Sequence, residues 1–252
     1  MFSRVAGVRI GYHEVGLGSP VVLLHGWGGD SRSFAPVQQA LASDFRVLAI
    51  DFPGFGRSAA PPETWGVGDY ADNLRRWLEE QGIDRVSLVG HSFGGRVAIV
   101  TAARWPTLVE RLVLVDSAGI LPRRTVGYHF KVRTSKIARR VLASPALARA
   151  RPALERRLYD ALGASDYAKA GPLRPTFVRV VNEDLRPLLP QITAPTLLIW
   201  GDKDDATPLE DGKLMAREIP GARLTIYPGA GHFAYLDRAD QFADDVRTFL
   251  SS

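Results

Sequence analysis

The chain has 252 residues, of which 46% are hydrophobic, and these values indicate one globular domain with a substantial core. Cysteine is absent, which excludes disulfides, thiolate metal sites and a cysteine nucleophile. The net charge is +5, and the sequence shows neither a secretory signal nor an apolar run of about 18 residues, so we expect a cytoplasmic protein without a membrane span.

The first half of the sequence alternates short apolar runs with amphipathic segments. Strands are predicted at 8–15, 20–26, 45–54, 86–90 and 110–117. Helices are predicted at 69–81 and at about 93–105. In the first helix Tyr70, Leu74, Trp77 and Leu78 share one face, and Gly82 can end it. Short apolar strands alternating with helices predict an α/β protein, with a mostly parallel central sheet flanked by helices.

The pattern changes between residues 119 and 190, where Arg, Ala, Leu and Pro are frequent. Several short helices and no strand are predicted in this segment. Strands then resume at 194–202 and 222–229, with helices near 208–219 and 237–250. We therefore expect a core formed by residues 1–118 and 191–252, with residues 119–190 inserted as a helical cap (lid) over the sheet edge.

The inserted segment is strongly basic, with fifteen Lys and Arg against five Asp and Glu. A basic segment can favour nucleic acid, an anionic membrane or an acidic substrate. This one lacks interleaved aromatic residues and any known nucleic-acid-binding motif. A solvated surface of Arg-rich helices is the simpler interpretation, and we expect no nucleic-acid partner.

The stretch VSLVGHSFGGRVAIV (86–100) places two polar side chains among glycines, between a predicted strand and a predicted helix. Its G-x-S-x-G pentapeptide, Gly90 to Gly94, has the pattern of a nucleophile elbow. The turn is so tight that only glycine avoids a clash two residues on either side of the serine. It lifts a hydroxyl clear of the sheet and directs the next helix N-terminus at the same point. Ser92 is therefore the predicted nucleophile.

A serine nucleophile needs a base, and the base needs a group that orients it. Among the five histidines, His232 follows the last predicted strand, in a loop that can reach the sheet edge, and is the predicted base. His91 is predicted to be structural and His25 to support its own loop. His13 and His129 receive no role.

Several carboxylates are candidates for the orienting acid. The loop WGDKDDATP, after the strand at 194–202, contains Asp202, Asp204 and Asp205. Asp204 is the preferred candidate and Asp205 the close alternative, while Asp116 is another carboxylate at a strand end. A buried carboxylate would fix the tautomer of His232 and stabilise its imidazolium form.

A second glycine-rich turn, HGWGG (25–29), also follows a predicted strand. We expect the backbone N–H groups of Trp27 and Phe93 to form an oxyanion hole. The rings of Trp27, Phe93 and Phe233 are candidates for an apolar, substrate-binding wall, or else for ordinary core aromatics. No metal and no cofactor are implied.

Together these stretches resemble the α/β-hydrolase fold superfamily over nearly the whole chain. The matching pieces are HGWGG (25–29), DFPGFGRS (51–58), GHSFGG (90–95), WGDKDDATP (200–208) and GAGHF (229–233). The order Ser, Asp, His is also that of the superfamily, and residues 119–190 look like its cap domain. The resemblance is specific for fold and triad but much less so for substrate.

The residues at positions 92 and 93 distinguish between the branches of this superfamily. Haloalkane dehalogenases and epoxide hydrolases use an aspartate at the position of Ser92, and cofactor-free haloperoxidases typically carry Met where Phe93 stands. The resemblance therefore implies a serine esterase that hydrolyses small-molecule carboxylic esters through a covalent acyl-enzyme. The alternatives are a carbon–carbon bond hydrolase acting on ring-fission-type diketone acids, which would suit a basic cap, and a ligand-sensing receptor.

Overall fold

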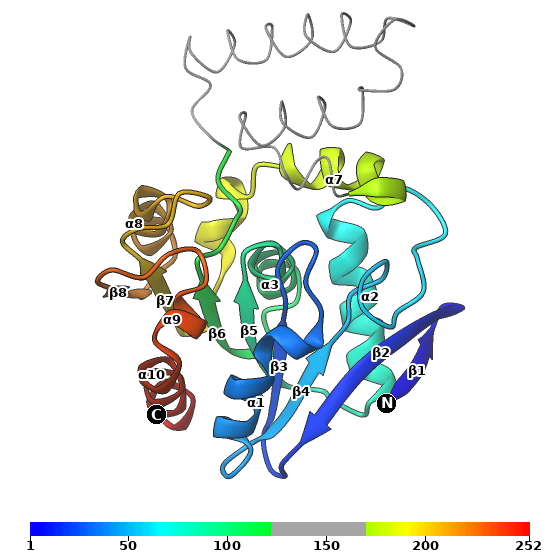
Figure 1. The fold of residues 1–252 in the computed structure, drawn as a ribbon, viewed down its shortest axis with the longest axis horizontal. Coiled ribbons are helices and arrows are strands. Elements are labelled where there is room, and N and C mark those ends of the chain that lie inside the picture. The colour runs from blue at the N-terminus through cyan, green and yellow to red at the C-terminus, as the bar shows by residue number, and fades with distance from the viewer. Residues whose placement is uncertain (122–169) are drawn as a thin grey trace, which may run out of the picture.

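An eight-stranded sheet forms the centre of the protein in a computed structural model, which describes residues 1–121 and 170–252 (Figure 1). The strands are β1 (Phe2–Val5), β2 (Val8–Val15), β3 (Pro20–Leu24), β4 (Arg46–Ile50), β5 (Val86–His91), β6 (Val109–Val115), β7 (Thr196–Gly201) and β8 (Arg223–Tyr227). Their order is β1-β2-β4-β3-β5-β6-β7-β8. β1 and β2 pair antiparallel, as do β2 and β4, whereas the remaining neighbours are parallel. The predicted mostly parallel sheet is confirmed.

Helices cover both faces of this sheet. One face packs against α2 (Val67–Glu80), α3 (Phe93–Arg104) and α8 (Leu209–Glu218). The other packs against α1 (Ala35–Leu41) and α10 (Ala239–Ser251). Shorter elements connect them: η1 (Ser31–Phe34), η3 (Gly171–Leu173), α7 (Arg174–Val181), η4 (Arg186–Gln191) and α9 (Ala234–Asp237). The result is a three-layer α/β architecture.

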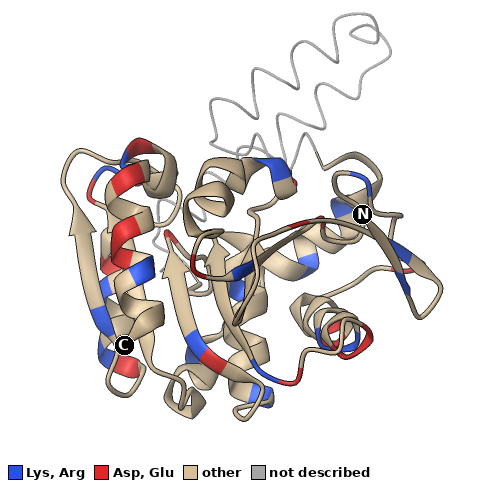
Figure 2. Cartoon of the chain, turned by 90° about the horizontal axis from the view of Figure 1, so that it is seen from below, with Lys and Arg blue, Asp and Glu red and all other residues tan. Residues whose placement is uncertain are grey.

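The central strands are apolar on both sides because both sides are covered. In β3, Val22 and Leu24 join the core under α2 and α3, while Val21 and Leu23 join the core under α1 and α10. β3, β5 and β7 contain no Lys, Arg, Asp or Glu. In Figure 2 most charged residues lie on helices and loops, and a few lie on strands.

Helix α2 illustrates how the sequence pattern becomes packing. All four residues predicted to share a face, namely Tyr70, Leu74, Trp77 and Leu78, are buried. Gly82 follows the helix with φ +66°, the left-handed conformation that glycine adopts readily. The helix begins slightly earlier than predicted, at Val67. By contrast, the sequence analysis did not predict β1 or α1.

Part of the predicted cap lies within the described residues. In this part, residues 170–190 form the helical elements η3, α7 and η4, and none of these residues is in a strand. The remainder of the predicted cap, residues 122–169, lies outside the described residues, so the domain boundaries stay a prediction. Where the described chain leaves and rejoins the core, the N–H of Leu185 donates to the carbonyl of Gly119 at 2.9 Å.

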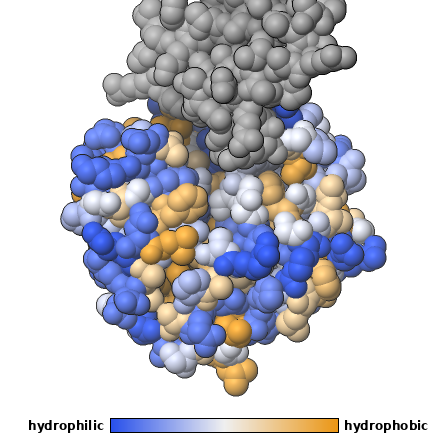
Figure 3. Space-filling view, viewed as in Figure 1, coloured by the Kyte–Doolittle hydropathy of each residue, from blue (hydrophilic) through white to orange (hydrophobic). Residues whose placement is uncertain are grey.

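None of the helices within residues 1–121 and 170–252 has the length and apolar character needed to cross a membrane. In the described part of the face shown in Figure 3, hydrophobic patches are interrupted by hydrophilic residues.

Candidate active site

The turn between β5 and α3 holds Ser92 in an unusual backbone conformation. Its φ is 51° and its ψ −111°, a strained combination for a residue with a side chain. A Cβ at Gly90 would lie 2.7 Å from the carbonyl oxygen of Gly94, and a Cβ at Gly94 would overlap the carbonyl of Leu24. Both glycines are therefore required by close backbone approach. This is the local geometry of a strained elbow that presents the serine side chain.

A histidine–carboxylate pair lies beside this turn. The Nδ1 of His232 is 2.8 Å from the Oδ2 of Asp204, and the Asp204 side chain is fully buried. Asp202 and Asp205 are exposed. The ring of His91, which precedes Ser92, is 4.8 Å from the ring of His232 between centroids. The structure thus pairs His232 with Asp204 and places both next to the elbow.

Three further donors hold the Asp204 carboxylate. Its Oδ1 accepts hydrogen bonds from the backbone N–H groups of Ala206 (2.8 Å) and Thr207 (2.9 Å). The Thr207 hydroxyl lies 2.6 Å from Oδ2 and 3.3 Å from the His232 Nδ1. Burial favours the neutral acid, but the hydrogen bonds from His232 and Thr207 outweigh it and hold the pKa of Asp204 below its ordinary value. Asp204 is therefore poised as an anion against the imidazole.

Thr207 is a site residue that the sequence analysis missed. It lies three residues after Asp204 in the same loop, and its hydroxyl contacts both members of the histidine–carboxylate pair. A threonine three residues after an aspartate is the spacing of a side-chain turn, which is the signal that could have identified it.

The remaining histidines of the motifs have structural contacts. His25 is fully buried, with Nδ1 2.8 Å from the Gly26 carbonyl, and its Nε2 accepts from the Phe52 N–H at 3.0 Å. His91 Nε2 lies 2.7 Å from the His232 carbonyl oxygen. Burial lowers the pKa of His91 to about 3, so its ring is neutral and donates Nε2–H to that carbonyl. Each histidine thus fixes one loop of the site.

The two expected oxyanion-hole residues lie side by side. The rings of Trp27 and Phe93 are 5.3 Å apart between centroids. Among the described residues, neither backbone N–H has a hydrogen-bond acceptor. Phe93 also begins α3, where the first N–H groups have no partner within the helix. The assignment of these two N–H groups to an oxyanion hole stays a prediction.

The three aromatic candidates for a substrate wall do not lie together. Phe93 is 2% exposed and belongs to the main core, whereas Trp27 is half-buried and also contacts Phe177 of α7 at 5.0 Å. Phe233 is 50% exposed, and its ring packs 5.2 Å from His91 and 5.4 Å from His232. The structure brings the rings of Trp27 and Phe93 together. It places the ring of Phe233 against His91 and His232 instead.

Asp116, the other strand-end candidate for the acid, does not bond to the imidazole. It is fully buried, and its two carboxylate oxygens accept from the backbone N–H groups of Gly201 and Ala234, each at 2.9 Å. Its carboxylate therefore binds the backbone of the two loops that carry Asp204 and His232.

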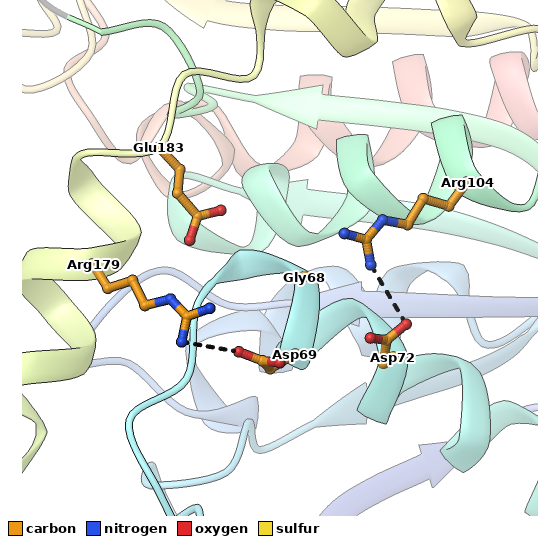
Figure 4. Close-up of a pocket in the computed structure, with 6 residues that line it drawn as sticks. All are labelled: Gly68, Asp69, Asp72, Arg104, Arg179 and Glu183. Carbon is orange, nitrogen blue, oxygen red and sulfur yellow. Dashed lines mark ion pairs between the residues drawn. The ribbon is translucent and has the colours of Figure 1, made fainter.

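A polar cavity of about 390 Å³ lies apart from these residues, between α2, the end of α3 and the α7 segment (Figure 4). Its lining residues are Gly68, Asp69, Asp72, Arg104, Arg179 and Glu183. Arg179 faces Asp69 at 3.6 Å and Arg104 faces Asp72 at 3.5 Å. Opposite charges pair across this cavity, and none of the candidate site residues lines it.

Within the part of the chain that the structure describes, no group of three or more His, Asp or Glu side chains is arranged to hold a metal ion.

Comparisons with known proteins show the family of the chain. Residues 21–245 match the model of the alpha/beta hydrolase family. The chain is 29% identical to a 2-hydroxy-6-oxo-2,4-heptadienoate hydrolase from Pseudomonas putida over 98% of this chain and 94% of that protein. It is also similar to two solved structures. The enol-lactonase of Burkholderia xenovorans LB400 has a TM-score of 0.78 and 26% identity, over all of both chains. The esterase of Exiguobacterium antarcticum has a TM-score of 0.78 and 25% identity, over 100% of this chain and 99% of that one.

Proposed function

Because the chain belongs to the alpha/beta hydrolase family, we propose that it is a serine hydrolase that cleaves carboxylic esters through a covalent acyl-enzyme. The observation that carries the proposal is the hydrogen bond between Asp204 and His232 beside the strained Ser92. This is the set of groups that acyl transfer requires: a nucleophile, a base and an acid that orients the base.

In the first half of the reaction Ser92 Oγ attacks the ester carbonyl while His232 Nε2 removes its proton. Asp204 accepts the Nδ1–H bond, which leaves the Nε2 lone pair free to act as the base. The anionic carboxylate then stabilises the imidazolium that forms. The N–H groups of Trp27 and Phe93 bind the developing oxyanion, an effect of about 3 kcal/mol for each donor.

Collapse of the tetrahedral intermediate breaks the bond to the alcohol, which leaves with the proton carried by His232. Water then attacks the acyl-enzyme with His232 again as base, and the acid product leaves from Ser92. None of these steps needs a cofactor or a metal ion.

The comparisons support ester cleavage and also its main alternative. The esterase and the enol-lactonase both act, by their names, on carboxylic esters or their cyclic form. The similarity to a 2-hydroxy-6-oxo-2,4-heptadienoate hydrolase is the specific observation that favours carbon–carbon bond cleavage as the second candidate. Both reactions can use the same serine, histidine and oxyanion donors, so the substrate decides between them.

The test is steady-state hydrolysis of p-nitrophenyl acetate, butyrate and octanoate, with 2-hydroxy-6-oxo-2,4-heptadienoate assayed in parallel. Wild type is compared with Ser92→Ala and with Ser87→Ala, a control that removes a buried hydroxyl from β5, the strand that precedes Ser92.

Multiple turnovers on an ester that disappear in Ser92→Ala and persist in Ser87→Ala are the expected result. Ser92-dependent turnover of the dienoate alone would favour the carbon–carbon hydrolase instead. Binding with at most one turnover on every substrate would contradict both enzymatic candidates and favour a receptor.

A further inference from the structure

Asp116 lies at the end of β6, directly between the two loops that carry Asp204 and His232. Its backbone N–H donates to the carbonyl of Ile199 in β7 at 3.0 Å. Its φ is 43°, the left-handed region that few residues with side chains adopt. The side chain is fully buried. The proposed reaction gives no role to this buried aspartate with a positive φ.

The carboxylate of Asp116 connects the two loops. Oδ1 accepts from the N–H of Gly201 at 2.9 Å, and Gly201 ends β7 three residues before Asp204. Oδ2 accepts from the N–H of Ala234 at 2.9 Å, two residues after His232. One rigid group thus fixes the backbone on both sides of the histidine–carboxylate pair.

Thr207 lies between Asp116 and the Asp204 carboxylate. The Thr207 hydroxyl lies within hydrogen-bond distance of the Asp116 carbonyl oxygen, at 3.0 Å, and of Asp204 Oδ2, at 2.6 Å. The single hydroxyl proton goes to the anionic carboxylate, at the shorter distance, so Thr207 holds Asp204 while the Asp116 side chain holds the same loop at Gly201.

We propose that Asp116 is a positioning residue, which sets the separation of Asp204 and His232 by bridging the N–H groups of Gly201 and Ala234. This inference rests on the proposed function, because it gives Asp116 a role in positioning the proposed triad. Both carboxylate oxygens of Asp116 accept from backbone N–H groups rather than from the His232 imidazole. Its effect arises because a hydrogen-bonded pair tolerates little displacement: a misplacement of about 1 Å in a catalytic group can cost about 100-fold in rate.

The test is Asp116→Asn, which keeps the shape of the side chain but turns an N–H donor toward one of the two backbone N–H groups. The matched control is Asp51→Asn. Asp51 is also a buried aspartate at a strand end and accepts from the N–H groups of Ser31 (2.8 Å) and Arg57 (3.0 Å).

Two readouts are measured on each folded variant. The first is kcat and KM on p-nitrophenyl butyrate. The second is the low-field proton resonance of the His232 Nδ1–H in the resting protein, which reports its bond to Asp204 without any substrate. Asp116→Asn is expected to lose or shift this resonance and to lower kcat about 100-fold, with KM within about threefold. Asp51→Asn should keep the resonance and most of kcat.

An unchanged resonance and kcat in Asp116→Asn would overturn the proposal. If Asp116→Asn does not fold, Ala234→Pro removes one donor to the bridge at a helix start, where proline is tolerated, and the same criteria apply. The resonance also separates the two hypotheses: its dependence on Asp116 can be observed even if the wild-type protein hydrolyses no ester.

Discussion

The guanidinium of Arg96 donates from Nη1 to the backbone carbonyl of Glu183 at 2.8 Å. Arg96 lies on α3, four residues after Ser92, and is only 5% exposed, whereas Glu183 follows α7 where the inserted segment returns. Burial lowers the pKa of Arg96 to about 10, which still leaves the side chain charged at neutral pH. Helix α3, which follows Ser92, is thus tied to the returning segment by a buried charged group.

Arg96→Leu should therefore lower the free energy of unfolding by about 1–3 kcal/mol, because the Glu183 carbonyl loses its charged donor. Chemical denaturation of both proteins measures this difference. Arg85→Leu is the control, since Arg85 is exposed and its pair with Glu110, at 3.5 Å, contributes at most about 1 kcal/mol. Equal losses in the two variants would contradict the role assigned to Arg96.

Asp204→Asn should lower kcat on a p-nitrophenyl ester by about 10³–10⁴-fold, because the amide cannot stabilise the imidazolium and favours the wrong tautomer of His232. Asp205→Asn should leave kcat within about twofold, since Asp205 is exposed. Steady-state kinetics on both variants checks this contrast. A larger loss in Asp205→Asn would assign the acid to the neighbouring position.

Gly94→Ala should prevent stable folding or lower the free energy of unfolding by more than about 3 kcal/mol, because its Cβ would overlap the Leu24 backbone. Gly68→Ala provides the comparison within another helix. There a Cβ would meet the guanidinium of Arg104, whose Nη2 is 2.8 Å away at the end of a flexible side chain, so we expect no loss beyond about 1 kcal/mol. Thermal unfolding of both variants measures the difference, and comparable losses would contradict it.

Asp211 should make the stability of the protein depend on pH. Burial, together with Glu210 and Asp204, raises its pKa from 3.8 to about 6. The folded state therefore binds its proton more tightly than the unfolded state, and the stability contributed by the neutral acid is lost as pH rises from about 4 to 6.

Across that interval the unfolding free energy of wild type should fall relative to Asp211→Asn by on the order of 1–2 kcal/mol, a value reduced for the partial exposure of the group. Denaturation of the two proteins at pH 4, 5, 6 and 7 measures it. A difference that stays constant with pH would rule out the raised pKa.

Local patterns predicted most of the fold and the outline of the site. The paired apolar faces of β3 and the buried face of α2 follow from periodicity, which depends only on neighbouring residues. The same holds for the elbow around Ser92, because its glycines are required within one turn. β1 was missed because only one of its four residues, FSRV, is buried, and the segment acquires strand structure by pairing with β2.

The sequence by itself therefore determined the α/β class, the covered parallel sheet and the position of the strained serine, since each depends on short-range spacing. Only the tertiary structure decided which of the candidate carboxylates meets His232, because Asp204 and the histidine are 28 residues apart in sequence. It also turned Asp116 from a candidate acid into a bridge between loops 85 and 118 residues away. Such contacts arise where strand ends converge at one edge of the sheet, and no local pattern encodes that convergence.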